Sequence, residues 1–160
     1  MKIKIFTVGG TIDKIYFDKK SDYDVGESII GDILREANVS FDFECQAIMS
    51  KDSLDMTAAD RQLVFDRVQQ DTNKRVVITH GTDTMIDTAR KLMAIEGKVI
   101  VLTGSMQPAR FKASDAEFNV GCAIAAVQAL PEGVYIVMNG CIFHPDKCKK
   151  NREHNRFENM

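Results

Sequence analysis

Short apolar runs alternate along the chain with segments in which apolar residues recur at helical spacing. The runs are rich in β-branched residues and most of them end at Gly, Ser or His, which is typical of strands. They predict five strands, at residues 3–8, 41–49, 76–79, 99–103 and 134–138. The helical spacing predicts four helices, at residues 27–37, 56–70, 84–96 and 115–130. The last segment, residues 147–160, is polar and predicts a loop or a tail.

The alternation of strands and helices indicates the class of fold. Short, nearly continuous apolar strands suit a parallel sheet whose helical crossovers cover both faces. We therefore expect an α/β fold, a three-layer sandwich with a doubly wound, mainly parallel sheet of the flavodoxin-like or Rossmann-like kind. The second helix also carries a start signal, because Thr57 stands where an N-cap would and Asp60 at the third helical position.

Composition removes several classes of function. The 160 residues carry a formal net charge of −2 with acids and bases mixed along the chain, so there is no basic footprint for nucleic acid and no polybasic membrane patch. No signal peptide and no membrane-spanning stretch are expected. The four cysteines form no CxxC pair, and their spacing fits no structural zinc pattern. We expect a cytoplasmic protein with reduced thiols, no metal and no cofactor.

Polar residues are concentrated directly after the predicted strands. Gly, Thr, Ser and Asp dominate these turns, at residues 9–13, 50–53, 80–84 and 104–106. In an open parallel sheet, ligands bind at the carboxyl ends of the strands. We therefore expect the four turns to converge on one rim and to form the site.

Two of the turns allow more than one interpretation. The hydroxyl of Thr11 could attack a substrate if a neighbour took its proton, or could serve only the backbone of a plain turn. Thr82 and Asp83 could relay a proton and accept a substrate ammonium, or could cap the following helix. Helix N-termini at this rim would supply N–H donors for a carboxylate or an oxyanion. We expect His80 to lie beside the site rather than to act as its base.

Together the two turns resemble the two active-site signatures of the bacterial-type L-asparaginase family. One is GGTI at residues 9–12, and the other is ITHGTDTM at residues 78–85. Each is moderately specific alone, and the pair in this order and separation is strong. Further segments extend the similarity over essentially the whole chain, at residues 21–26, 52–56, 103–108 and 137–139.

The resemblance implies a catalytic set. Thr11 would attack the side-chain amide with the help of Tyr23, beside a triad of Thr82, Asp83 and Lys150. An acyl-enzyme ester would form, ammonia would leave, and water would release the acid. The sequence leaves open which hydroxyl attacks first.

The lysine is the least secure member of that set. The family's spacing places it at Lys150, but Lys147 and Lys149 lie close by. The same run could also be a basic patch exposed to solvent.

The resemblance also implies substrate-binding residues, which are Gly10, Ser53, Leu54, Gly81 and Ser105. Ser53 would bind the α-carboxylate, the backbone of Ser105 would lie at the substrate, and the backbone N–H of Thr82 would stabilise the oxyanion. Leu54 replaces a residue that is polar in many members, which could shift the choice between asparagine and glutamine. Tyr23 could instead be a plain exposed loop aromatic, and Ser53 a plain turn residue.

The resemblance implies an amidohydrolase that converts L-asparagine to L-aspartate and ammonia without a cofactor. Typical members add a smaller carboxy-terminal domain, so we expect residues 1–160 to be a single amino-terminal-type domain, as in short asparaginases, assembled as a homodimer or a dimer of dimers. The alternatives are a hydrolase of another small amide and a non-catalytic amino-acid-binding domain. Because binding alone does not require two threonines facing a lysine, we favour an enzyme.

Overall fold

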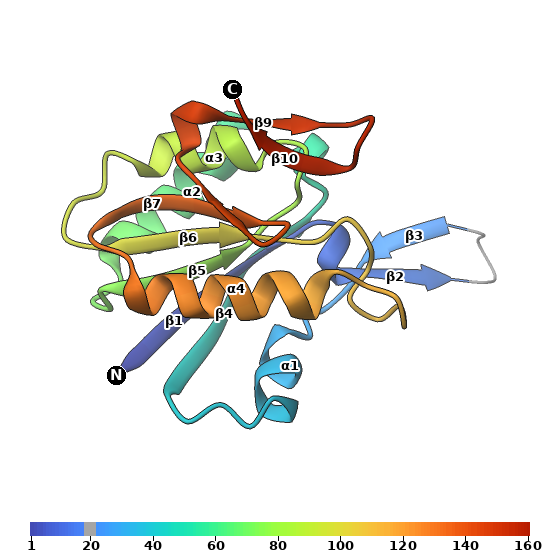
Figure 1. Ribbon diagram of the computed structural model, residues 1–160, viewed down its shortest axis with the longest axis horizontal. Helices are drawn as coiled ribbons and strands as arrows, with labels where there is room; N and C mark the ends of the chain where they lie inside the picture. Colours follow the sequence, from blue (N-terminus) through green and yellow to red (C-terminus); the bar gives the residue numbers. More distant parts are fainter. Residues whose placement is uncertain (18–21) are drawn as a thin grey trace.

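The centre of the molecule is a six-stranded sheet in the order β4-β1-β5-β6-β7-β8 (Figure 1). The computed structural model describes residues 1–17 and 22–160. The first five strands of this order are parallel and β8 runs antiparallel to β7. Their bounds are β1 (Lys2–Gly9), β4 (Asp42–Lys51), β5 (Arg75–Thr79), β6 (Val99–Thr103), β7 (Gly133–Met138) and β8 (Cys141–Phe143).

The strand order is that of a flavodoxin-like sheet. Counted along the chain, the parallel strands lie in the order second, first, third, fourth, fifth. The chain therefore moves away from β1 in both directions, towards β4 on one side and β5 on the other. Such a reversal is the switch point at which open α/β sheets bind their ligands.

Helices cover both faces of the sheet, which confirms the predicted three-layer sandwich (Figure 1). Two helices pack on one face and two on the other. The first pair is α2 (Ala58–Gln70) and α3 (Met85–Leu92), and the second pair is α1 (Ile30–Glu36) and α4 (Ala116–Ala129). The layers enclose two apolar clusters, one on each side of the sheet.

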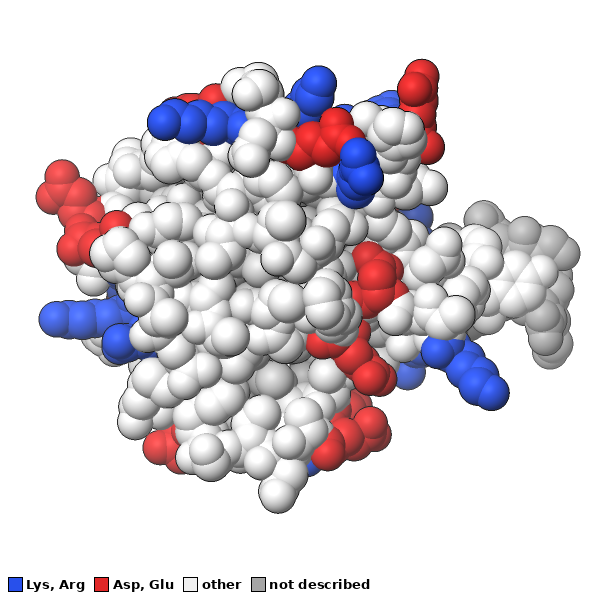
Figure 2. Space-filling view, in the orientation of Figure 1, with Lys and Arg blue, Asp and Glu red and all other residues white. Residues whose placement is uncertain are grey.

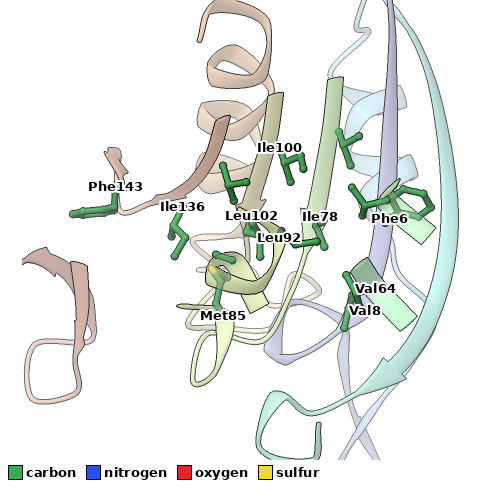
Figure 3. Close-up of a cluster of buried hydrophobic side chains, with 14 of the residues drawn as sticks. Phe6, Val8, Val64, Ile78, Met85, Leu92, Ile100, Leu102, Ile136 and Phe143 are labelled. Atoms are coloured by element: carbon green, nitrogen blue, oxygen red, sulfur yellow. The ribbon is translucent and has the colours of Figure 1, made fainter. Parts of the chain in front are cut away.

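The buried central strands supply both clusters, because successive side chains of a strand point to opposite faces. Ile78, Ile100 and Leu102 point to the side of α2 and α3, where Figure 3 shows them together with Met85 and Leu92 of α3. Val77 and Val101 point to the side of α1 and α4. Two-sided burial explains why the strand segments read as continuous apolar runs.

The capping signal of α2 is confirmed. The Thr57 hydroxyl accepts from Asp60 N at 3.2 Å, and the Asp60 carboxylate accepts from Thr57 N at 2.8 Å. Two helices are shorter than predicted, since α1 begins at Ile30 and α3 ends at Leu92. After α3 the backbone forms i→i−3 hydrogen bonds, from Met93 to Arg90 and from Ile95 to Leu92, which tighten the chain and end the α-helical pattern.

Strand β8 and two small hairpins outside the main sheet were not predicted. The hairpins are β2 (Lys14–Phe17) with β3 (Asp22–Val25), and β9 (Cys148–Asn151) with β10 (Arg156–Asn159). The interpretation of residues 147–160 as a loop or tail is therefore wrong, because cross-strand hydrogen bonds order this polar segment. Within the segment 21–26 that extends the family similarity, residues 22–25 form strand β3, and Ser21 lies outside the described residues.

The surface carries its charges in small groups. In Figure 2 acidic and basic side chains lie mainly at the periphery of the face shown, and its middle is free of them.

Within the part of the chain that the structure describes, no helix is both long and apolar enough to span a bilayer.

Candidate active site

The turns that follow β1, β5 and β4 lie in direct contact at the switch point. A Cβ atom on Gly10 would lie 2.3 Å from the Cα of Gly81, and a Cβ on Gly81 would lie 2.6 Å from the Cβ of Ser53. Gly10 N also donates to the Lys51 carbonyl at 2.9 Å. The absence of side chains at both glycines thus lets three turns close on one point, which brings Thr11, Ser53 and Thr82 to one rim.

Thr82, Asp83 and Lys150 form one hydrogen-bonded cluster. Lys150 Nζ donates to Thr82 Oγ1 at 2.7 Å and to Asp83 Oδ1 at 2.9 Å. Thr82 is 5% exposed and the Lys150 side chain 15%, whereas Lys147 and Lys149 are exposed. Of the three lysines that the sequence left open, the structure therefore brings Lys150 to the two signature residues.

The structure does not support the interpretation of Thr82 and Asp83 as helix caps. The N-cap of α3 is Thr84, whose own side chain makes no capping hydrogen bond with the helix. The Thr84 hydroxyl instead donates to the Ser53 carbonyl at 2.8 Å and ties the turn after β5 to the turn after β4. Thr82 and Asp83 thus have no capping role and point to the amine.

Ser53 is buried with an unused hydroxyl. Its side chain is 1% exposed, and Oγ has no hydrogen-bond partner among the described residues. Buried polar atoms are nearly always paired, so an orphan at this rim is available to a ligand. Next to it, Leu54 is 65% exposed and donates its N–H to Asp52 Oδ1 at 3.1 Å.

Tyr23 lies on β3, which projects from the end of the sheet to which the strand arrows point (Figure 1). Its ring packs against Tyr16 and Phe111, with centroids 5.2 and 6.2 Å apart, and it is 46% exposed. Tyr23 and Leu54 line a hollow of about 560 Å³ between the hairpin and residues 50–55. Tyr23 therefore stands at the edge of the site, on a strand rather than on a loop.

Thr11 and Ser105 lie on two turns that are joined by the backbone. Thr11 is half-buried and begins a single 3₁₀ turn, Thr11–Asp13. Ser105 is buried and donates through Oγ to the Gln107 carbonyl. Ala109 N donates to the Ile12 carbonyl at 3.0 Å, which fixes the turn after β6 against the turn that carries Thr11.

His80 supports the turn from beneath. It is wholly buried, its Nδ1 lies 2.7 Å from the Gly81 carbonyl, and its Nε2 lies 2.8 Å from Thr88 Oγ1. A carbonyl can only accept, so the proton belongs on Nδ1 and Nε2 accepts from the Thr88 hydroxyl. Burial lowers the pKa of His80 to about 4, and the ring is neutral at physiological pH. This arrangement agrees with the expected supporting position.

Several polar residues around the site were not anticipated. Arg152 NH2 lies 3.4 Å from Asp83 Oδ1, so Asp83 faces two cations. Asp115 accepts from the N–H groups of Met106 and Gln107 and holds the turn after β6. Asn119 lies one helical turn after Asp115, within the mainly apolar helix α4. This spacing places the two polar side chains on one face of the helix, and it could have been recognised in the sequence.

Asp13 introduces a dependence of stability on pH beside Thr11. Its carboxyl is 3% exposed, and Oδ1 has no hydrogen-bond partner among the described residues. Burial raises the pKa of Asp13 from 3.8 to about 6, although the Ser28 hydroxyl and the Arg110 guanidinium act in the opposite direction. Because the folded pKa exceeds the unfolded one, this group opposes folding as the pH rises from about 4 to 6, by up to about 3 kcal/mol.

Asp13→Asn is therefore expected to stabilise the protein most at alkaline pH. The gain in the free energy of unfolding should be about 1.5 kcal/mol larger at pH 8 than at pH 5, because the wild-type carboxyl is mostly protonated at the lower pH. Urea unfolding at both pH values measures this difference. Asp42→Asn, at an exposed position, controls for the loss of one negative charge. An equal gain at the two pH values would show that Asp13 does not titrate in this range.

No group of three or more His, Cys, Asp or Glu side chains within residues 1–17 and 22–160 is placed to hold a metal ion.

The fold and the rim define a flavodoxin-like α/β protein with hydroxyl, carboxylate and amine groups at its switch point. The chain belongs to the asparaginase family: residues 2–158 match the model described as "Asparaginase, N-terminal". This match confirms the family resemblance that the two signatures indicated.

The curated proteins that the chain resembles include glutaminase-asparaginases. The chain is 41% identical over 85 residues to a glutaminase-asparaginase of Acinetobacter glutaminasificans, covering 50% of this chain and 26% of that protein. It is 42% identical over 69 residues to a glutaminase-asparaginase of Pseudomonas aeruginosa, covering 40% of this chain and 19% of that protein.

A solved structure extends the likeness to the full chain. The thermostable L-asparaginase from Thermococcus kodakarensis superimposes with a TM-score of 0.86 at 26% identity, over 100% of this chain and 51% of that one. L-asparaginase I from Vibrio cholerae gives a TM-score of 0.83 at 27% identity, over 99% of this chain and 51% of that one. The chain thus spans about half the length of the solved relatives, and still less of the curated ones.

Proposed function

We propose that this protein is an asparaginase-type amidohydrolase that cleaves the side-chain amide of L-asparagine into L-aspartate and ammonia through a threonine nucleophile. The observation that carries the proposal is the contact of one part-buried amine, Lys150 Nζ, with both Thr82 Oγ1 and Asp83 Oδ1. A solvent-facing lysine would not be held in this way, because exposed ion pairs gain little and lose side-chain entropy. The Lys150 amine is instead hydrogen-bonded to the Thr82 hydroxyl, an arrangement suited to proton transfer through that hydroxyl.

In this proposal Thr11 Oγ attacks the amide carbon. A threonine hydroxyl needs a neighbour to take its proton, and Thr82, backed by Lys150, lies across the contact between Gly10 and Gly81. Tyr23, at the edge of the site, assists that transfer. The C–N bond then breaks, the departing nitrogen receives the hydroxyl proton, and ammonia leaves a Thr11 ester. Water adds its OH to the ester carbonyl and returns its proton to Thr11.

Substrate groups match the remaining side chains by charge. The Asp83 carboxylate accepts hydrogen bonds from the α-ammonium group of the substrate. The Ser53 hydroxyl, which has no partner among the described residues, donates to the α-carboxylate. The backbone N–H of Thr82 stabilises the oxyanion, since donors aimed at developing charge are worth several kcal/mol of barrier. Gly10 and Gly81 let the backbone approach the amide, and Ser105 and Leu54 complete the wall.

The size of the substrate is the less constrained part of the proposal. Relatives are named both for asparagine and for glutamine, and Leu54 adds apolar surface beside the hollow. We propose asparagine as the preferred amide. Cytoplasmic location and a homodimer or dimer of dimers stay predictions.

Ammonia release from a panel of small amides tests the proposal. The purified protein should release ammonia and the matching acid in equal amounts from L-asparagine, with lower kcat/KM on L-glutamine and on simple amides. Thr11→Val, which keeps the shape of the side chain and removes the hydroxyl, should abolish release.

Three other outcomes would change the conclusion. Thermal stabilisation by asparagine that stays intact would identify an amino-acid-binding domain. Release from another amide alone would place the protein among hydrolases of a different small amide. Release that survives Thr11→Val would rule out Thr11 as the nucleophile.

A further inference from the structure

The hairpin that carries Lys150 is not part of the main sheet. Strands β9 and β10 pair only with each other among the strands that the structure describes. In Figure 1 the hairpin lies over the side of the sheet that carries α3. Cys148 and Phe157 anchor it by their burial, and Phe157 N donates a backbone hydrogen bond to Asn139 Oδ1 at 2.9 Å, in addition to the contacts of Lys150 and Arg152 with the rim. Phe157 is the register partner of Lys150 in the ladder.

Asn139 is built to hold this position. It follows β7 directly, with φ at 55°, and Gly140 beside it has φ at 77°. Met138 pairs with Cys141 across this two-residue connection. Two successive left-handed residues make the turn that best fits the twist of a tight hairpin. The backbone of Asn139 is thereby fixed by the edge of the main sheet.

Asn119 fixes Asn139 from the other side. Its amide is 1% exposed inside α4, and Oδ1 accepts from Asn139 N at 3.0 Å. Its Nδ2 donates to the Gly104 carbonyl at 3.1 Å and to Asp115 Oδ2 at 2.9 Å. One continuous set of hydrogen bonds therefore leads from the turn after β6 through α4 and the turn after β7 to Phe157, opposite Lys150.

We propose that Asn139, held by Asn119, is a positioning residue that sets the reach of Lys150 to Thr82 and Asp83. Packing of Phe157 and Cys148 permits the hairpin to slide or tilt, because apolar contact is not directional. The bond to Phe157 N removes that freedom at the cross-strand neighbour of Lys150. The catalytic consequence rests on the proposed function, whereas the anchoring itself does not.

Asn139→Gly tests the proposal because glycine keeps the left-handed turn and removes only the side chain. The variant should lower kcat for amide hydrolysis roughly 10- to 100-fold, as small misplacements of catalytic groups do, with a smaller change in KM. Asn139→Asp retains the Oδ1 acceptor and should recover most of the rate. In a Lys150→Met background, Asn139→Gly should cause no further loss.

The matched control is Asn155→Gly. Asn155 also has a left-handed backbone, with φ at 48°, and lies in the same hairpin. It is exposed, and it takes no part in the anchoring bond between Phe157 N and Asn139 Oδ1. This variant should keep the wild-type rate. A loss equal to that of Asn139→Gly would overturn the proposal, since it would reflect general loosening of the hairpin.

Readouts that do not need activity separate this proposal from the proposed function. Amide hydrogen exchange of Phe157 should accelerate at least tenfold in Asn139→Gly and return towards wild type in Asn139→Asp. A crystal structure of Asn139→Gly should show that the Lys150 Nζ contact to Thr82 Oγ1 is lengthened or lost. An unchanged contact, or unchanged exchange, overturns the positioning role even if the wild-type protein hydrolyses no amide. Faster exchange without activity in the wild type would support the anchoring and reject the proposed function.

Discussion

Lys150→Met is expected to lower kcat for asparagine hydrolysis by about 10²- to 10³-fold, the cost of about 3–4 kcal/mol seen when one preorganised polar group is removed from a hydrolase site. Methionine fills nearly the same volume and keeps the apolar stem. It removes the amine that contacts Thr82 Oγ1 at 2.7 Å and Asp83 Oδ1 at 2.9 Å. Steady-state ammonia release measures the effect, and circular dichroism checks the fold.

The neighbouring lysine provides the control. Lys149 is exposed and pairs across the ladder with Glu158, so Lys149→Met removes the same charge one residue away without touching the rim. It should keep the wild-type kcat within about twofold. Thr82→Val should cost as much as Lys150→Met, and the double variant little more, because groups that act as a unit are not additive. Losses that multiply would show that the amine and the hydroxyl work independently.

Gly10→Ala is expected to destabilise the fold by about 3 kcal/mol or more, and to remove activity with it. The new methyl group would lie 2.3 Å from Gly81 Cα and 2.4 Å from Gly81 N, both backbone atoms that cannot rotate away. The φ of Gly10 is 92°, outside the range that L residues readily adopt. Turns after β1 and β5 would have to separate, which would open the contact on which the site depends.

Gly97→Ala distinguishes the two causes of that loss. Gly97 also has a positive φ, 78°, but a Cβ there would meet nothing within 4 Å. It therefore measures the conformational cost alone, about 1–2 kcal/mol. Urea unfolding of both variants gives the comparison. Equal losses would mean that the contact between the two turns tolerates a methyl group.

The sequence by itself determined the sandwich and indicated where along the chain the candidate site lies. Helical spacing and two-sided apolar runs are local patterns, so they locate α2, β5 and β6 without knowledge of their neighbours. The Thr57 and Asp60 cap is equally local, since both partners lie within four residues. Turns rich in Gly, Thr and Asp mark strand ends, and parallel strands place their ends on one edge of a sheet.

The hairpin of β9 and β10 was beyond local patterns. Strands β9 and β10 contain two buried apolar residues, Cys148 and Phe157, so the segment has no apolar face to detect. Their order comes from cross-strand hydrogen bonds and from docking on a core built by distant residues. Asn139-Gly140 was a readable signal for the tight turn before β8, because this pair favours two left-handed residues, and it was missed.

Tertiary structure alone decided which strands are neighbours and which lysine meets the threonine. The order of the strands depends on the direction of each crossover, which no single segment encodes. The sequence could therefore predict that the turns after the strands converge, but not that Gly10 contacts Gly81. Lys147, Lys149 and Lys150 are chemically alike, and only their places in the turn and on the strand tell them apart. A one-residue change of register exchanges the two sides of a strand. In the observed register Lys150 pairs with Phe157, whose N–H donates to Asn139 Oδ1.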